Sequence, residues 1–309
     1  MTRRVLISSF LSTSLLSVGL LAQAPAGAPP QGPAGAPPAG GRGPAGPPML
    51  QTQKVKDNLY VITGGGGNST VFITQNNGVV VIDTKNPGVG QLLIEQVGKI
   101  TSQPISTVVN SHTHADHTGG NVDFPVTTRF MAHVNTRANM QKMDQFQGDN
   151  AKFIPTQTFQ DKLSLFSGSD RIDLYYFGPG GTNGDAWVVI PSLRLMVGAD
   201  DFNKGLTLLD ANNGGSARAF QQTLARVASE IEGVDTVVTG HGGVLTWNEF
   251  LEFTQLTNDF YTWVRAQKAA GKTVEQTAME WQIPAKYVGY APTNPMFLQR
   301  VVQVVYNEP

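Results

Sequence analysis

Four of the five histidines in the chain stand at the ends of two expected strands, and three of them fall within six residues. The segment His112-Thr113-His114-Ala115-Asp116-His117 carries three imidazoles and one carboxylate. In a loop, His112 and His114 can point to one side, while Asp116 and His117 turn toward a neighbouring position. Imidazole nitrogen and carboxylate oxygen are ligands that zinc and similar ions accept. Burying so many titratable groups without compensation would cost free energy, so this cluster predicts a metal site.

The composition limits what kind of metal site this can be. The chain contains no cysteine, which excludes thiolate ligands, a thiol nucleophile and a disulfide framework. Imidazole and carboxylate must therefore hold any metal ion. The formal net charge is -1 and no basic block is present, so nothing favours nucleic acid as a partner. A small-molecule substrate fits the composition better. The sequence predicts no particular oligomeric state.

The elements that must position these residues follow from hydrophobic patterning. Short β-branched runs separated by glycine and asparagine turns predict a strand meander over 51–83, with a flexible hairpin tip at Gly64 to Gly67. An apolar run over 105–109 predicts a buried strand that ends almost at His112. Helical spacing of apolar residues follows Pro87 and recurs over 217–231 and from Trp247 onward. Gly119 and Gly120 fit a helix start close behind the histidine cluster. Further strands are expected at 130–132, 162–166, 172–177, 187–190, 193–197 and 236–239. Strands first dominate and then alternate with helices, which indicates a layered α/β domain.

The amino terminus has the features of an export signal. Arg3 and Arg4 precede an apolar stretch over 5–21, and Ala22-Gln23-Ala24 fits a cleavage site. We therefore expect a signal peptide over 1–24, with a membrane anchor as the alternative. Residues 25–50 are rich in Pro, Ala and Gly and predict a disordered linker. The mature chain is expected to be periplasmic or secreted, without stable membrane insertion after cleavage.

The histidine cluster resembles the HxHxDH signature of the metallo-β-lactamase-fold hydrolases, and other segments over about 51–253 follow the same family's order. The matching segments are Gly78–Thr84, with an aspartate after a strand; Gly178–Asp185, similar to a GHTxGD turn; Met196–Asp201, similar to a strand ending in a metal-bridging aspartate; and Thr239–Gly242, similar to a GHG turn. The resemblance implies an αββα sandwich of the α/β class, with the metals at one edge of its two sheets. We place this domain at 51–309, with a helical C-terminal extension from about 247.

The resemblance also implies the ligand set. His112 and His114 would hold the first metal, and Asp116, His117 and His241 the second, with Asp200 between the two ions. The neighbouring Asp201 is the alternative to Asp200, because the family has one acid at this turn.

One position departs from the family's pattern. Gly181 stands where the family has the third histidine of the first site, and glycine has no side-chain donor. Asn183 and His133 are the candidates to replace that ligand. We expect one ion held by the second site, or two ions with a weak first one.

These residues predict an exported hydrolase that uses zinc, as one or two ions, to activate water. Asp116 would also orient this water or carry its proton. The expected substrates are a cyclic amide, a lactone, an ester or a thioester. The alternative is a metal-binding or ligand-binding pseudoenzyme that lost turnover with the histidine, and a flavodiiron-type redox protein ranks last.

Overall fold

The structure, a computed structural model, describes residues 48–290 and 293–309. The expected signal peptide over 1–24 and the expected linker up to residue 47 lie outside the described residues. None of the helices in the described part of the chain has the length and apolar character that a membrane crossing requires.

The first sheet has seven strands among the described residues, and its order follows the sequence. Strands β1 to β4 are antiparallel, whereas β4 to β7 are parallel. The strands are β1 (Gln51–Lys56), β2 (Leu59–Thr63), β3 (Ser69–Ile73), β4 (Val79–Ile82), β5 (Ile105–Val109), β6 (Arg129–His133) and β7 (Gln157–Phe159). The buried β4 segment Val-Val-Val-Ile is β-branched throughout, as expected of a strand covered on both faces.

The second sheet has six strands within the described ranges, in the order β13-β12-β11-β10-β9-β8. Its one parallel pair is β11 with β12. The strands are β8 (Lys162–Leu165), β9 (Ile172–Tyr175), β10 (Trp187–Ile190), β11 (Leu195–Ala199), β12 (Thr236–Thr239) and β13 (Val244–Thr246).

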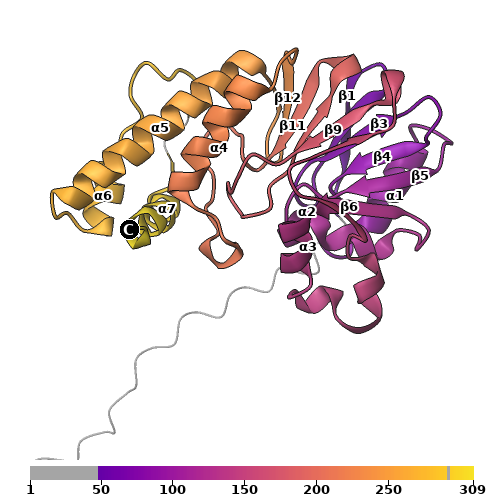
Figure 1. Cartoon of the computed structure of the whole chain (residues 1–309), viewed down its shortest axis with the longest axis horizontal. Coiled ribbons are helices and arrows are strands. Elements are labelled where there is room, and N and C mark those ends of the chain that lie inside the picture. Colours follow the sequence, from indigo (N-terminus) through magenta and orange to yellow (C-terminus); the bar gives the residue numbers. More distant parts are fainter. Residues whose placement is uncertain (1–47, 291–292) are drawn as a thin grey trace, which may run out of the picture. The chain divides into compact units, whose positions relative to one another are not determined.

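Three apolar clusters show that the two sheets pack face to face with helices outside them. One cluster joins inward side chains of both sheets, such as Val80 and Val188. A second lies between the first sheet and α1 (Gly90–Gly98), which contributes Leu93 and Val97. The third lies between the second sheet and the C-terminal helices, and Trp187 and Phe250 meet there. Figure 1 shows these helices on opposite sides of the paired sheets. The expected αββα sandwich is confirmed.

The remaining helices are α2 (Ala115–Thr118), α3 (Val134–Met140), α4 (Ala217–Glu230), α5 (Trp247–Ala269), α6 (Val274–Glu280) and α7 (Pro295–Asn307). Helix α5 begins with a capping box, in which Thr246 and Glu249 satisfy each other's backbone N–H groups. Helix α7 contacts α4, α5 and α6, so the end of the chain returns to the domain. Helices α5, α6 and α7 form the helical C-terminal extension of the fold.

The structure differs from the sequence-based elements mainly at short elements. Helix α3 was not predicted. The strands β7 and β13 were not predicted, because three residues are too few to show a hydrophobic period. The sequence suggested that a helix begins near Gly119, but α2 begins at Ala115 and a 3₁₀ turn follows over Gly119–Asp123. Asp116 and His117 therefore lie in the helical turn itself, and the ring of His117 packs against that of His112 with 4.3 Å between the ring centroids.

Candidate metal centre

The candidate ligands follow four strands at one edge of the sandwich. In the first sheet, β4 leads to Asp83 and the parallel β5 leads to His112. In the second sheet, β11 leads to Asp200 and the parallel β12 leads to His241. Parallel strands end at the same edge of a sheet, so each pair brings its two residues together. Ligand sites are common outside the carboxyl ends of such strands.

The first group of donors consists of His112, His114 and Asp200. Nε2 of His112 lies 3.0 Å from Nδ1 of His114. Oδ2 of Asp200 lies 3.5 Å from the first of these nitrogens and 3.9 Å from the second. The group thus offers two imidazole nitrogens and one carboxylate oxygen to a single point.

The second group consists of Asp116, His117 and His241. Nε2 of His241 lies 3.0 Å from Oδ2 of Asp116 and 3.2 Å from Nε2 of His117. Asp200 stands between the two groups, because its Oδ1 is 3.2 Å from Nε2 of His117 while its Oδ2 faces the first group. The structure therefore brings together all six residues that the sequence singled out.

The spacing of these atoms fits metal ligation. Ligands about 2.0–2.1 Å from a tetrahedral zinc ion are about 3.3 Å from one another, close to the distances between these donors. In addition, Oδ1 of Asp200 is buried and accepts no hydrogen bond from the described residues. A buried carboxylate oxygen without a donor is costly unless a cation compensates it.

The electrostatics of the cluster also favour a cation. Burial alone would lower the pKa of His117, but the charges of Asp200 and Asp83 outweigh burial and raise this pKa well above its usual value. Hydrogen bonds with Asp116 and Asp200 raise the pKa of His241 to about 9. The carboxylates thus create a negative potential at the imidazole nitrogens. A metal ion would take the place of these protons, since metal binding to histidine releases protons.

Asp83 orients two of the histidines from behind. Its Oδ2 accepts hydrogen bonds from Nδ1 of His117 at 2.8 Å and from Oγ of Ser111 at 2.6 Å, and Ser111 contacts Nδ1 of His112 at 2.9 Å. Both rings consequently turn their Nε2 atoms toward the donor groups. Asp83 therefore bonds to the loops that carry His112 and His117. Asp83 also adopts φ 65°, a conformation that Asp and Asn tolerate better than most residues.

Asp210 supports the third histidine, and the sequence analysis missed it. Its Oδ2 lies 3.1 Å from Nε2 of His114, so Nδ1 of that ring is left to face the first group. Its Oδ1 accepts the backbone N–H groups of Asn212 and Asn213. The only signal in the sequence was an Asp before an Asn-Asn-Gly-Gly turn, which is typical of turn capping and does not reveal a partner 96 residues away.

Asp210 should affect one ion, whereas Asp83 should affect both. In Asp210→Asn, the side-chain oxygen can keep its bonds to the backbone N–H groups of Asn212 and Asn213, and the new amide nitrogen then faces the N–H of His114. Two donors facing each other cannot hold the ring. We therefore expect roughly 10- to 100-fold weaker binding of the first ion only. Asp83→Asn should weaken both ions by a similar factor, because Asp83 orients His117 directly and His112 through Ser111. Zinc titration of each variant against a competing chelator measures both affinities. Asp57→Asn, on the exposed turn between β1 and β2, is the control. Equal losses at both ions in Asp210→Asn would contradict this assignment.

The space around Gly181 is filled by its own neighbours. A Cβ atom there would lie 3.0 Å from the backbone oxygen of Leu208 and 3.4 Å from Oδ1 of Asp201. The backbone N–H of Gly181 donates to Oδ1 of Asp201 at 2.8 Å. Burial raises the pKa of Asp201 well above its usual value, and the charge of Asp185 adds to this rise. Asp201 thus faces the Gly181 turn, whereas Asp200 faces the histidines.

The two candidates for replacing the missing imidazole lie in other surroundings. The ring of His133 stacks on Tyr176 at 3.8 Å, and its Nδ1 accepts the N–H of Asn135 at the start of α3. The side-chain oxygen of Asn183 accepts a hydrogen bond from Asn139. His133 belongs to none of the groups of histidine and carboxylate donors found in the described residues. The suggestion that they replace the third histidine is wrong for this geometry, because their polar atoms already serve local structure.

A glycine-rich loop closes the cluster from the side of β2. The N–H of Gly67 donates to the backbone oxygen of Asp116 at 3.0 Å, and the N–H of Asn68 donates to that of Gly240 at 2.7 Å. The buried ammonium of Lys85 donates to the backbone oxygen of Gly67 at 2.6 Å, and burial lowers the pKa of Lys85 to about 7. The loop therefore joins the two segments that carry the second donor group. The sequence suggested a flexible hairpin tip here, but these bonds fix its base.

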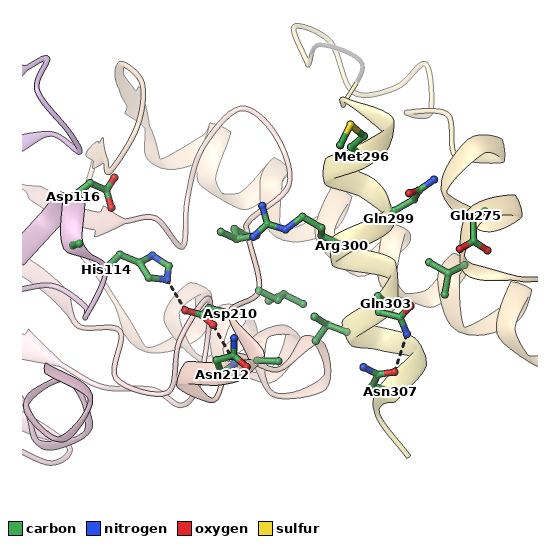
Figure 2. A pocket seen from close by; sticks show the side chains of 16 residues that line it. His114, Asp116, Asp210, Asn212, Glu275, Met296, Gln299, Arg300, Gln303 and Asn307 are labelled. Atoms are coloured by element: carbon green, nitrogen blue, oxygen red, sulfur yellow. Dashed lines mark hydrogen bonds and ion pairs between the residues drawn. The ribbon is translucent and has the colours of Figure 1, made fainter. Parts of the chain in front are cut away.

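Two adjoining cavities open next to the donors. A cavity of about 290 Å³ is lined by members of both donor groups, His114, Asp116, Asp200 and His241, together with Leu206, Leu208 and Phe297. A larger one of about 950 Å³ also reaches His114 and Asp116 and extends along α7 (Figure 2). A small organic molecule can thus approach the donors from the side of α7.

Comparison with known proteins agrees with this geometry. Residues 62–241, more than half of the chain, match the family model described as the metallo-beta-lactamase superfamily. A type 2 metallo-beta-lactamase of Elizabethkingia meningoseptica is 25% identical over 211 residues, which cover 63% of this chain and 79% of that protein. The alpha subunit of 2,4-dinitroanisole O-demethylase from Nocardioides sp. (strain JS1661) is 26% identical over 164 residues, or 52% of this chain. The match spans about half (48%) of that relative's length.

Solved structures show the same fold at lower identity. A metallo-beta-lactamase from Pontibacter korlensis is 18% identical and superposes with a TM-score of 0.57, covering 68% of this chain and 99% of that one. A stereoselective inverting sec-alkylsulfatase from Pseudomonas sp. is 14% identical with a TM-score of 0.68, covering 84% of this chain and 50% of that one. The superposition on the alkylsulfatase covers more of this chain than the superposition on the lactamase does, so the shared architecture continues beyond the part that the lactamase covers.

Proposed function

Because the chain belongs to the metallo-beta-lactamase superfamily, which implies a metal-dependent hydrolase, we propose that it uses zinc to hydrolyse a cyclic amide, lactone, ester or thioester. One observation carries this proposal. Four imidazoles and two carboxylates from both sheets converge in two donor groups beside a cavity. The chemistry then depends on which groups hold metal and which remain free for substrate.

The chain's own residues have separable tasks in this proposal. The second group would hold the tighter ion, because it has all three of its donors in addition to the shared Asp200. The first group, without an imidazole at Gly181, would hold a weaker ion or none. Zinc held by these donors would lower the pKa of a coordinated water molecule to near 7 and so supply a nucleophile at neutral pH.

Asp116 is the proposed catalytic residue. Its carboxylate is partly exposed and lines both cavities, and its Oδ2 also contacts His241. A carboxylate in this place can accept a hydrogen bond from an attacking water molecule, orient it toward the substrate and receive its proton. Asp83 and Asp210 act only through the histidines that they orient.

The substrate classes are tested with purified protein that contains a measured amount of zinc. Atomic spectroscopy gives the ions per chain, and a panel of a cephalosporin, a lactone, an alkyl ester, a thioester and a sec-alkyl sulfate gives the reaction. The sulfate is included because of the structural likeness to the alkylsulfatase. We expect hydrolysis of at least one carbonyl substrate, its loss on removal of the metal by a chelator, and its return when zinc is added.

The same experiment separates the alternatives. If the zinc-loaded protein hydrolyses nothing in the panel, the pseudoenzyme hypothesis replaces this one. If only the sulfate is cleaved, the carbonyl substrate class is wrong. We also propose that the enzyme is exported to the periplasm or secreted, because residues 1–24 have the pattern of a cleavable signal. Amino-terminal sequencing of the mature protein tests this by showing a start after Ala24.

A further inference from the structure

Helix α7 lines both cavities with one face. Phe297 borders the smaller cavity beside Asp116 and His241. Arg300 and Val304, three and seven residues later, border the larger cavity. Residues with this spacing lie on the same side of a helix. The face of α7 therefore forms a wall that runs from the metal donors outward.

Arg300 is the one arginine or lysine among the described residues that line the larger cavity. Figure 2 shows its side chain extending from α7 across the cavity toward Asp210 and His114. It is exposed and forms no ion pair or hydrogen bond with another described residue. Asp210, by contrast, is already engaged by His114 and by Nδ2 of Asn213. A guanidinium group thus remains available in a cavity that reaches two of the candidate ligands.

We propose that Arg300 selects substrates that carry a carboxylate on the part of the molecule away from the bond that is cleaved. The proposal rests on the proposed hydrolase function. The planar guanidinium presents parallel N–H donors that match the two oxygens of a carboxylate. Leu208 lines both cavities and Phe297 lines the smaller one beside the donors, so these two side chains offer apolar surface to the connecting part of the substrate. The recognised class is an ester, thioester or amide with an apolar spacer and a terminal carboxylate.

Matched ligands test the recognition without turnover. Dicarboxylates from succinate to suberate are compared with methyl-terminated acids of the same carbon number, so that each pair differs only at the end away from the metal. Calorimetry on the zinc-loaded protein gives the two dissociation constants. We expect the best dicarboxylate to bind roughly tenfold more tightly than its partner. Arg300→Met should remove this difference, and Arg300→Lys should keep part of it because the charge remains.

Matched 4-nitrophenyl esters test the same recognition during hydrolysis. The monoesters of the same dicarboxylic acids are compared with esters of the methyl-terminated acids. The ratio of kcat/KM should favour the carboxylate series in the wild type and fall roughly tenfold in Arg300→Met. Added salt should lower the wild-type ratio and leave the Arg300→Met ratio almost unchanged. The control is Arg129→Met, which removes an exposed arginine at the start of β6, outside both cavities.

The outcomes separate this proposal from the proposed function. If neither these esters nor any substrate of the panel is hydrolysed but the affinity ratio depends on Arg300, the hydrolase function fails and the carboxylate site stands. If esters are hydrolysed and both ratios are the same in wild type and Arg300→Met, the carboxylate site is overturned. The same ratio change in Arg129→Met as in Arg300→Met would also overturn it, since the effect would then come from net charge.

Discussion

Replacing His117 with alanine is expected to remove one metal ion per chain and to lower kcat/KM by about 10³-fold or more. The ring is fully buried, and its Nε2 faces Asp116, Asp200 and His241 at 3.2–3.6 Å. Metal catalysis contributes several kcal/mol of transition-state stabilisation, and each 1.36 kcal/mol corresponds to a factor of ten in rate. Metal content by atomic spectroscopy and the hydrolysis of the best panel substrate measure both effects.

Two further variants make this prediction specific to the loss of a ligand. Alanine also leaves Asp83 without the N–H of His117, so part of its effect could come from misfolding. His117→Asn keeps a donor close to the position of Nδ1 but lacks Nε2, and it should lose the ion while circular dichroism remains that of wild type. His133→Phe preserves the stacking on Tyr176 and should retain the metal. Full metal content in His117→Asn would refute the role of His117 as a ligand.

Replacing Gly67 with alanine is expected to lower kcat/KM by about 100-fold or more, although Gly67 carries no chemical group. An added Cβ would lie 2.1 Å from Cε1 and 2.3 Å from Nε2 of His117. The ring cannot turn aside, because Asp83 holds it, and the loop is fixed by its bond to Asp116. Either the ligand or the loop must therefore move, and a displacement of about 1 Å at a reacting centre can cost a factor of about 10². Metal titration and steady-state kinetics measure the effect.

A second glycine gives the matched control. Gly98 ends helix α1, and a Cβ there would meet no atom within 4 Å. Gly98→Ala should leave metal content and kcat/KM unchanged and stabilise the protein by up to about 1 kcal/mol. Wild-type metal affinity in Gly67→Ala would show that the loop has more freedom than its hydrogen bonds indicate.

The sequence predicted the architecture well where patterns are local and strong. The strand at Ile105–Val109 and the helix after Ser216 were expected within a residue of their observed limits, since β-branched runs and helical spacing reflect burial directly. The start of α2 at Ala115 was missed, because a helix of four residues shows no period of its own. Short elements of this kind are positioned by contacts with the rest of the fold.

The sequence by itself determined which side chains can bind a metal. Three imidazoles and a carboxylate within six residues, no cysteine, and glycine at position 181 are properties of the chain alone. Their closeness needs little tertiary information, because the residues of one loop are neighbours in any compact fold.

Only the tertiary structure decided how these groups are held and what can reach them. It turned Asp200 rather than Asp201 toward the histidines, joined Asp210 to His114, and brought Arg300 of α7 to the cavity beside the donors. These partners are separated by about 90 residues or more along the chain. Hydrophobic period and motif spacing describe neighbours along the chain, whereas such pairs arise when the two sheets and the returning C-terminal helix bury their apolar faces together.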